Sequence, residues 1–369
     1  MQFDRAAFIQ GFVRYAVAVL LVLAIGSLIL ALDGKNPVEV FAKIIERSAV
    51  GEANIGRSLR WAAPVIIAGL AGLVAWRSGA LNLGIDGQIY LGAFVGAVAG
   101  YAIEAPAGLH IPIAILCGAA AGAAWTLLPA LLKLFVNVNE MVTTLMMNYI
   151  AVYLTTYLTI MLIGQDASNT NPDYLSTQKI LDTAKLARLL PPSQVSTSLF
   201  MALGLSVLIF LVLRFSTSGY EMNMTGRNER NARYAGISTK TLMLGTFLAS
   251  GAIAGVAGAT EILGVHYKFQ PNFATGLGWD GIMVMLIAKM NPLAVVLVGL
   301  LWGMLKNGAF AIERELGVNR MMVIVLQALF VLFVTTDLRV VFKLAVQGLR
   351  KRFRSPAPKT NATPEPVDK

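Results

Sequence analysis

The sequence predicts an all-α protein that crosses a membrane several times. Hydrophobic residues make up 56% of the 369-residue chain and charged residues only 14%, against about 25% charged residues in soluble domains. The mean hydropathy is +0.67. Apolar runs close to the roughly 20 residues that cross a bilayer recur along the chain. We therefore expect about ten transmembrane helices, some of them short or broken.

The first predicted span, 15–32, follows Arg5 and Arg14 and could be mistaken for a signal peptide. Its uncharged run is long for such a peptide, and no small-residue cleavage site follows before Asp33. We expect an uncleaved anchor, preceded by a short cytoplasmic segment, 1–14. The remaining predicted spans are 61–76, 88–103, 111–132, 141–163, 197–213, 241–260, two short spans within 274–310, and 321–336.

The division of 274–310 into two spans depends on the Lys289–Pro292 stretch, which indicates a tight turn. It also places the basic loop 214–240 and the basic C-terminal residues on the same side of the membrane, as the positive-inside rule favours. The expected domains are then the membrane domain 15–338 and a tail, 339–369. The tail is rich in proline and charge, which predicts disorder.

Two further patterns concern packing. Charged residues alternate with Val40, Ile44 and Ile45 at helical spacing in the first outside loop, which predicts an interfacial amphipathic helix. Glycines spaced by four predict close helix contacts. They form four rows: Gly92, Gly96 and Gly100; Gly118 and Gly122; Gly251 and Gly255; Gly299 and Gly303.

Several classes of function are excluded. The net charge of +10 comes from loops and the tail without interleaved aromatic residues, so we expect no nucleic-acid partner. His110 and His266 lie far apart and predict no metal site, and Cys117 is a packing residue. The sequence has no G-x-x-x-x-G-K-[ST] loop to bind ATP. Polar groups that could pair for catalysis are almost missing from the span centres, so we expect no enzyme.

The segment 78–88, SGALNLGIDGQ, is a polar interruption between two predicted spans. Backbone that leaves the helix at membrane depth must be buried in protein or line a water-filled cavity, because its amides otherwise lack hydrogen-bond partners. Broken helices of this kind mark transport sites, so Asn82 and Gln88 are candidates for a solute pathway. An ordinary cytoplasmic turn would give the same pattern.

A second polar stretch, NVNEMVTTLMMN at 137–148, opens the predicted span 141–163. Glu140, Thr143 and Asn148 fall near one helical face and are further candidates for the solute pathway. Glu140 can equally well serve the helix N-terminus, where a carboxylate interacts favourably with the helix dipole. Asn148 lies two turns into the span, where an amide needs an interhelical partner or a polar ligand.

The third polar stretch, GRNERNARYAGI at 226–237, predicts a short water-facing helix between two spans. Its arginines cannot lie in hydrocarbon, where each charge costs about 2.5 to 3.5 kcal/mol. Gly236 is placed to end this helix. A polar helix in this position indicates a soluble protein partner, although a basic loop that only contacts lipid head groups is the alternative.

Together these stretches resemble the inner-membrane permease subunits of ATP-binding-cassette (ABC) importers. The resemblance rests on GALNLGIDGQIYLGAF (79–94), VNEMVTTLMMNYIA (138–151), GYEMNMTGRNERNARYAGI (219–237) and GWDGIMVMLIAKMNP (278–292). Within the nucleoside, simple-sugar and branched-chain amino acid permeases, the nucleoside branch is the most similar. Asn223, Met224 and Asn231 depart from the family pattern.

The resemblance implies a bacterial inner-membrane protein with both termini in the cytoplasm and no cofactor of its own. ATP and Mg would be bound by a cytoplasmic ABC ATPase, and the other implied partners are a second permease subunit and an extracytoplasmic solute-binding protein. The loop 214–240 would carry the coupling helix that docks on the ATPase. The residues of this loop that match the family pattern are Gly226, Asn228, Ala232, Tyr234, Gly236 and Ile237. Arg230 is a further candidate for contact with the ATPase.

The expected function is ATP-driven import of a small neutral polar solute by alternating access, with nucleosides favoured by the resemblance. The amides of Asn82, Gln88 and Asn148 would also suit a pentose. An ion-coupled secondary transporter would need carboxylates near the midplane, and the candidates are Asp86, Glu140, Glu261 and Asp280. A scaffolding membrane protein has no need for the polar break at 78–88.

Overall fold

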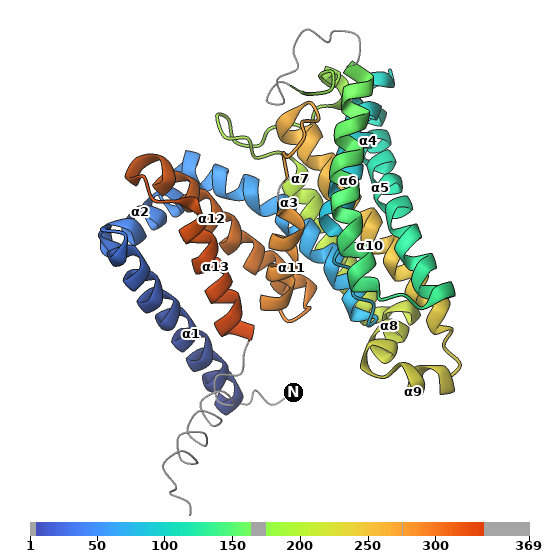
Figure 1. The fold of residues 1–369 in the computed structure, drawn as a ribbon, viewed down its shortest axis with the longest axis horizontal. Coiled ribbons are helices and arrows are strands. Elements are labelled where there is room, and N and C mark those ends of the chain that lie inside the picture. Colours follow the sequence, from blue (N-terminus) through green and yellow to red (C-terminus); the bar gives the residue numbers. More distant parts are fainter. Residues whose placement is uncertain (1–4, 164–174, 275, 336–369) are drawn as a thin grey trace, which may run out of the picture. The chain divides into compact units, whose positions relative to one another are not determined.

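The computed structural model describes residues 5–163, 175–274 and 276–335, and every regular element in these ranges is helical (Figure 1). The predicted tail, 339–369, lies outside the described residues. The α-helices are α1 (Arg5–Leu32), α2 (Pro37–Ala49), α3 (Glu52–Arg77), α4 (Ile85–Ala102), α5 (Ala107–Leu131), α6 (Glu140–Ile163), α7 (Ser198–Phe215), α8 (Thr217–Arg227), α9 (Glu229–Tyr234), α10 (Thr239–Glu261), α11 (Leu277–Ile287), α12 (Pro292–Leu316) and α13 (Arg320–Thr335). Short π-helical turns extend α5 (η1, Leu132–Val136) and α10 (η4, Ile262–His266), and η3 (Asp182–Ala184) is a 3-10 turn.

The prediction of an all-α membrane protein is confirmed. Six described helices, α3, α5, α6, α7, α10 and α12, are long and apolar enough to cross a membrane, or seven if α1 and α2 form one broken span. Each predicted span coincides with one helix, and the spans outside these six or seven are α4, α11 and α13. The turn predicted at 289–292 separates α11 from α12.

The chain divides into two compact units, of which Ser27–Ile324 is the larger. In this unit α10 packs against α3, α4 and α5, and α12 packs against α2 and α3. The smaller unit takes in the beginning of α1 and the end of α13. All the sites described below belong to the larger unit.

The glycine rows lie at helix contacts, as predicted. A Cβ on Gly92 would be 2.4 Å from the Cα of Gly255, and one on Gly122 would be 2.2 Å from the carbonyl oxygen of Gly251. These rows bring α4, α5 and α10 together. Gly299 and Gly303 seat α12 on α3, against Ile66 and the carbonyl of Ser58. Without a side chain at these positions the backbones approach closely, which is how helices associate in lipid.

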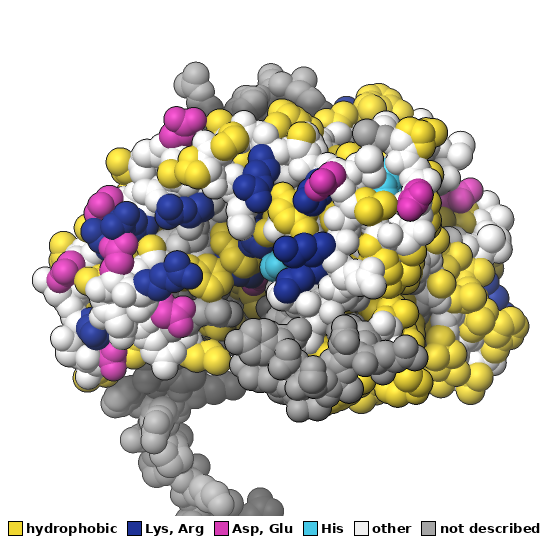
Figure 2. All heavy atoms as spheres, turned by 90° about the horizontal axis from the view of Figure 1, so that it is seen from above, with side chains coloured by type: hydrophobic (Ala, Val, Ile, Leu, Met, Phe, Trp, Pro, Cys, Tyr) yellow, Lys and Arg dark blue, Asp and Glu magenta, His cyan; other side chains and the backbone are white. Residues whose placement is uncertain are grey.

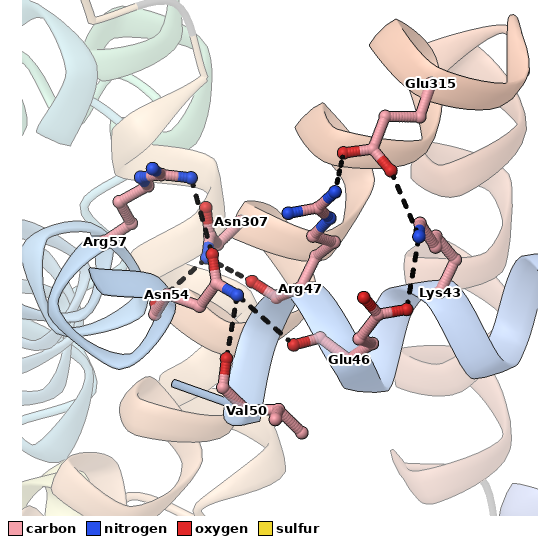
Figure 3. A network of polar contacts seen from close by, with 8 residues as sticks. All are labelled: Lys43, Glu46, Arg47, Val50, Asn54, Arg57, Asn307 and Glu315. Carbon is pink, nitrogen blue, oxygen red and sulfur yellow. Dashed lines mark hydrogen bonds and ion pairs between the residues drawn. The ribbon is translucent and has the colours of Figure 1, made fainter. Parts of the chain in front are cut away.

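The predicted amphipathic helix is α2, and α12 covers its apolar face. Val40 and Ile44 are buried in a cluster that includes Ile312. The polar face of α2 is tied to α12 by ion pairs from Glu315 to Lys43 and Arg47, at 3.4 and 2.7 Å (Figure 3). The segment between α2 and α3 is held by Asn307, whose Nδ2 donates to the carbonyls of Arg47 and Asn54 and to the hydroxyl of Ser58.

The segment 175–197 lies across the ends of α4 and η4, at the end of the helices opposite α8 and α9 (Figure 1). Three of its backbone amides donate to carbonyl oxygens of these elements. The amide of Ile180 donates to Tyr267, that of Leu181 to Gly100 and that of Leu186 to Leu263. His110 at the start of α5 is fully buried, and its ring nitrogens contact the hydroxyl of Thr183 and the carbonyl of Ala99. Figure 2 views the molecule from this end, and Lys and Arg side chains gather near the centre of the visible face.

Candidate functional site

The break between α3 and α4 begins with a turn at Ser78 and Gly79 and continues to Gly84 as a mostly buried, non-helical segment. α3 ends at Arg77 and α4 begins at Ile85. Within the break, Asn82 is fully buried, and its Nδ2 donates to Gln88 Oε1 (3.1 Å) and to Ser250 Oγ of α10 (2.9 Å). Its Oδ1 accepts from Gln88 Nε2 (3.0 Å) and from the amide of Gly84 (2.9 Å). The polar side chains thus supply the partners that the broken helix lacks.

α6 satisfies the other side of the same break. Thr144 Oγ1 accepts from the amide of Leu83 at 3.1 Å. Asn148 Nδ2 donates to the carbonyl of Leu83 at 2.8 Å, and its Oδ1 accepts from the amide of Gly87 at 2.8 Å. Asn148 therefore has the interhelical partners that an amide two turns into a span requires. The contacts fix α6 to the start of α4.

A cavity of about 760 Å³ opens beside this junction, and we call it the α4–α6 cavity. Among the described residues, its wall combines aromatic rings with uncharged polar groups and a single carboxylate. The lining residues are Asp86, Tyr90, Leu145, Asn148, Tyr149, Val152, Tyr153, Thr156, Leu175, Gln270, Pro271, Asn272, Gly276 and Trp279. Its volume falls within the range of about 300 to 1,000 Å³ that is typical of small-molecule sites.

The two tyrosines of α6 shape the open side of the cavity. Tyr149 and Tyr153 are one turn apart on one helix face, and Tyr153 is 74% exposed. Across the cavity, Tyr90 of α4 packs against Phe273 and Phe269 with ring centroids 5.3 and 6.4 Å apart. The aromatic wall thus has a rigid side, packed against other rings, and an open side. Open aromatic faces bind flat solutes by stacking.

The carboxylates considered for ion coupling differ in their surroundings. Three of them are paired with a cation: Glu261 with Arg60 at 2.6 Å, Asp280 with Lys306, and Glu140 with Lys133 at 2.8 Å. Asp86 has no lysine or arginine within ion-pair distance in the described part of the chain. Its Oδ1 accepts from the amide of Gly278 at 2.6 Å, at the N-terminus of α11. Asp86 therefore links α4 to α11 at the wall of the α4–α6 cavity.

The polar loop is built from two short helices. Gly226 and Arg227 belong to the last turn of α8, whereas Asn228 caps α9 by accepting from the amide of Asn231 at 3.2 Å. The prediction of one helix for this loop is therefore wrong. Gly236 ends α9 as predicted, with a φ of 83° that favours glycine. The amide of Ile237 then donates to the carbonyl of Ala232 at 3.0 Å.

α9 is tied firmly to the start of α10. Arg233 pairs with Glu229 within α9, and Arg233 Nε donates to Thr239 Oγ1 at 3.1 Å. Ala232 is fully buried, but Tyr234 is 91% exposed and projects from the loop. A second cavity, of about 610 Å³, lies between this loop, the break and the beginning of α6. The loop is therefore ordered by its own contacts and still presents side chains to a partner.

The predicted pathway residues do not form a single site. Asn82 and Gln88 come together in the closed hydrogen-bond network of the break. Asn148 is in the wall of the α4–α6 cavity. Glu140 lines the second cavity beside the polar loop, and Thr143 Oγ1 bonds only to carbonyls of its own helix turn in the described contacts. Asn139 caps α6 by accepting from the amide of Met141 at 2.9 Å.

Most residues of the cavity wall were not predicted from the sequence. Asp86 was visible only as a possible ion-coupling carboxylate. Tyr149 and Tyr153 lie one helical turn apart in the predicted span just after Asn148, and this pair of rings was the signal that could have identified them. Gln270, Asn272 and Trp279 come from a distant segment, which only the packing of α11 against α4 brings to the cavity.

Comparison with known proteins places the chain in a family. A family model described as branched-chain amino acid transport system / permease component matches residues 54–334. The chain is 33% identical to the guanosine ABC transporter permease protein NupP of Bacillus subtilis, over 88% of this chain and 93% of that protein. It is 30% identical to the glucose ABC transporter permease protein TsgB13 of Haloferax volcanii, over 91% of each.

A third relative is the nucleoside ABC transporter permease protein NupB of Lactococcus lactis, which is 26% identical over 86% of this chain and 89% of that protein. No solved structure matches the chain significantly. The family match spans every element that forms the two cavities, from α3 to α11. The chain belongs to the branched-chain amino acid transport system permease family, and it is a multi-pass membrane permease of an ABC transporter.

Proposed function

We propose that this permease passes nucleosides across the inner membrane and takes them up through the α4–α6 cavity. The observation that carries the proposal is the cavity wall, in which tyrosine and tryptophan rings stand beside amides and one carboxylate. Two of the three relatives described above are named for guanosine or nucleoside transport.

The wall suits the two halves of a nucleoside. A base can stack on Tyr149, Tyr153 or Trp279, and such stacking contributes about 1 to 3 kcal/mol per base in nucleic-acid-binding proteins. The ribose hydroxyls can donate to Asp86 and exchange hydrogen bonds with Asn148. A simple sugar is the second candidate, because one relative is named for glucose. A sugar would use the polar groups but would leave much of the aromatic surface without a flat partner.

Uptake measurements separate these candidates. The permease is reconstituted into vesicles with its ATPase, second permease subunit and solute-binding protein, and uptake of labelled guanosine and uridine is followed. We expect unlabelled nucleosides to compete and ribose or glucose in large excess not to compete. Competition by the sugars alone would contradict the nucleoside assignment. Uptake that survives a nonhydrolysable ATP analogue and stops with a protonophore would instead favour an ion-coupled carrier.

Because this sequence has no phosphate-binding loop, we assign transport of the solute to this chain and hydrolysis of ATP to another subunit. ATP and Mg are bound by a separate cytoplasmic ATPase, and this chain carries no cofactor. In this proposal the end of the molecule viewed in Figure 2 is the outer one, and a solute-binding protein docks there. Both chain termini are then cytoplasmic. A second, related permease subunit completes the membrane part of the transporter. Lipid covers the other apolar faces.

The polar loop is the docking site for the ATPase. Its support is the ordered geometry of α9 together with the exposed side chains of Arg230 and Tyr234. Because Ala232 is buried, a change there would damage the loop itself. The sharper test is Tyr234→Ala combined with Arg230→Glu. We expect the ATPase to be lost from a pull-down while the thermal stability of the permease is unchanged. An ATPase that still co-purifies and turns over normally would show that docking occurs elsewhere.

A further inference from the structure

We propose that Arg77 couples the polar loop to the α4–α6 cavity, by joining α8 to the break between α3 and α4. This inference rests on the proposed docking of the ATPase at the loop. Arg77 is the last residue of α3, so any displacement of its backbone is passed directly into the break. It is a positioning residue, because it acts through its neighbours and does not line the α4–α6 cavity in the described structure.

The Arg77 side chain contacts two other elements besides its own helix. Its Nε donates to Asn223 Oδ1 of α8 at 2.6 Å. Its Nη1 donates to the carbonyl of Met290, in the turn between α11 and α12, at 3.0 Å. Asn223 is in turn fixed to α8 by a bond from its Nδ2 to the carbonyl of Gly219 at 2.8 Å. A guanidinium presents several donors in a fixed planar geometry, so one arginine can orient two partners at once.

The backbones of α8 and the break also touch each other. A Cβ on Gly226 would lie 2.2 Å from the carbonyl oxygen of Arg77. On the other side, Gly79 has a φ of 85°, and its Cβ would be 3.5 Å from the Cα of Gly226. The last turn of α8 therefore sits directly on the residues that follow α3. Movement of α8 cannot occur there without moving the chain at 77–79.

From this point the break carries the displacement to the cavity. Six residues further on, the backbone of Leu83 is held by both Thr144 and Asn148, and Asn148 also binds the amide of Gly87. Asn148 lines the α4–α6 cavity, and Asp86 lies between these two anchored positions. Because the segment is short and is held by hydrogen bonds at Leu83 and Gly87, displacement of its first residues is passed on to α6. The path therefore runs from α8 through Arg77 and the break to α6.

Asn223 departs from the family pattern, and its contact with Arg77 gives this departure a structural reason. Its side chain points inward to Arg77 and not outward to a partner protein. Substituting Asn223 should therefore leave the ATPase contact intact and affect only the transfer of motion. This expectation separates coupling from docking and makes the inference testable.

The experiment measures solute transported per ATP hydrolysed in vesicles that contain the complete transporter. The variants are Arg77→Gln, Asn223→Ala and the double variant, with Asn223→Asp as the conservative replacement that keeps an acceptor for Arg77. We expect each single variant to retain the ATPase in a pull-down and to hydrolyse ATP, while solute per ATP falls at least tenfold. The double variant should be no worse than the singles, because residues that act through one contact are not additive. Asn223→Asp keeps the acceptor for Arg77 but loses the donation to the carbonyl of Gly219, so its ratio should fall less than that of Asn223→Ala.

Ser216→Ala is the matched control, because it removes a polar side chain from the other end of α8, where Ser216 accepts from the amide of Gly219. Its ratio should stay within twofold of wild type. An unchanged ratio in Arg77→Gln and Asn223→Ala would overturn the inference, and so would loss of the ATPase from the pull-down. The ratio is measured with whichever solute the wild-type transporter carries. A sugar cargo would therefore contradict the proposed substrate while the ratio still decides the role of Arg77.

Discussion

Two polar regions meet at the beginning of α4, and they differ in what their polar groups already bind. In the break, the Asn82 side chain is fully buried and makes four hydrogen bonds to protein. In the wall of the α4–α6 cavity, aromatic and polar side chains border an open volume of about 760 Å³. The first region satisfies its own backbone, whereas the second leaves surface for a solute.

This difference separates two reasons for placing polar residues at membrane depth. A buried amide that completes the bonding of a broken helix stabilises the fold, because unsatisfied backbone in hydrocarbon is costly. A polar or aromatic group at an open cavity contributes to affinity and need not contribute to stability. Asn148 belongs to both regions, since it holds the break and borders the cavity. Substitutions in the two regions should therefore fail in different ways.

The largest effect is expected for Asn82→Leu. The change leaves Gln88 and the amide of Gly84 without their partner in a fully buried site, and each unsatisfied group costs about 1 to 3 kcal/mol. We expect little folded protein in the membrane, measured by size-exclusion chromatography of the detergent extract and by thermal melting. A variant that melts like wild type but no longer transports would show that Asn82 contacts the solute directly.

The next effect is expected for Tyr153→Leu, in the cavity wall. Loss of a stacking surface should raise the nucleoside concentration for half-maximal uptake about tenfold, which corresponds to about 1.4 kcal/mol. The melting temperature should not change, because this side chain is largely exposed. The matched control is Tyr157→Leu, which removes an equally large ring one turn further along α6, outside the residues that line the cavity. Equal effects of the two substitutions would mean that the α6 tyrosines serve a subunit interface and not the solute.

The sequence predicted the helical architecture well because its signals are local. Apolar runs located the spans, and glycine spacing located the seams at Gly92, Gly122 and Gly255. The end of α9 at Gly236 followed from the conformational preference of glycine. The division of the polar loop at Asn228 was missed, because capping by this side chain depends on the direction that the chain takes after α8.

The cavity was predicted less completely because it is assembled from distant segments. Polarity alone identified Asn82, Gln88 and Asn148 together, yet only Asn148 lines the cavity as well as holding the break. Glu140 was grouped with them by helical periodicity, although the two turns between Glu140 and Asn148 place them at different cavities. Helical periodicity predicts which residues share one face of a helix. It does not predict which neighbouring helix packs against each part of that face.

The smallest effect is expected for Ser250→Ala, which removes one bond from Asn82 and leaves the other three. A single intramolecular hydrogen bond contributes about 1 kcal/mol, so the melting temperature should fall by a few degrees while half-maximal uptake is unchanged. Ser206→Ala is the matched control, since it removes a buried bond of similar length to the carbonyl of Pro292, away from the break. If Ser250→Ala and Ser206→Ala lose similar stability and both retain normal uptake, the break is structural. If only Ser250→Ala alters uptake, the hydrogen-bond network of the break must open during transport, and its polar groups then serve the solute as well as the fold.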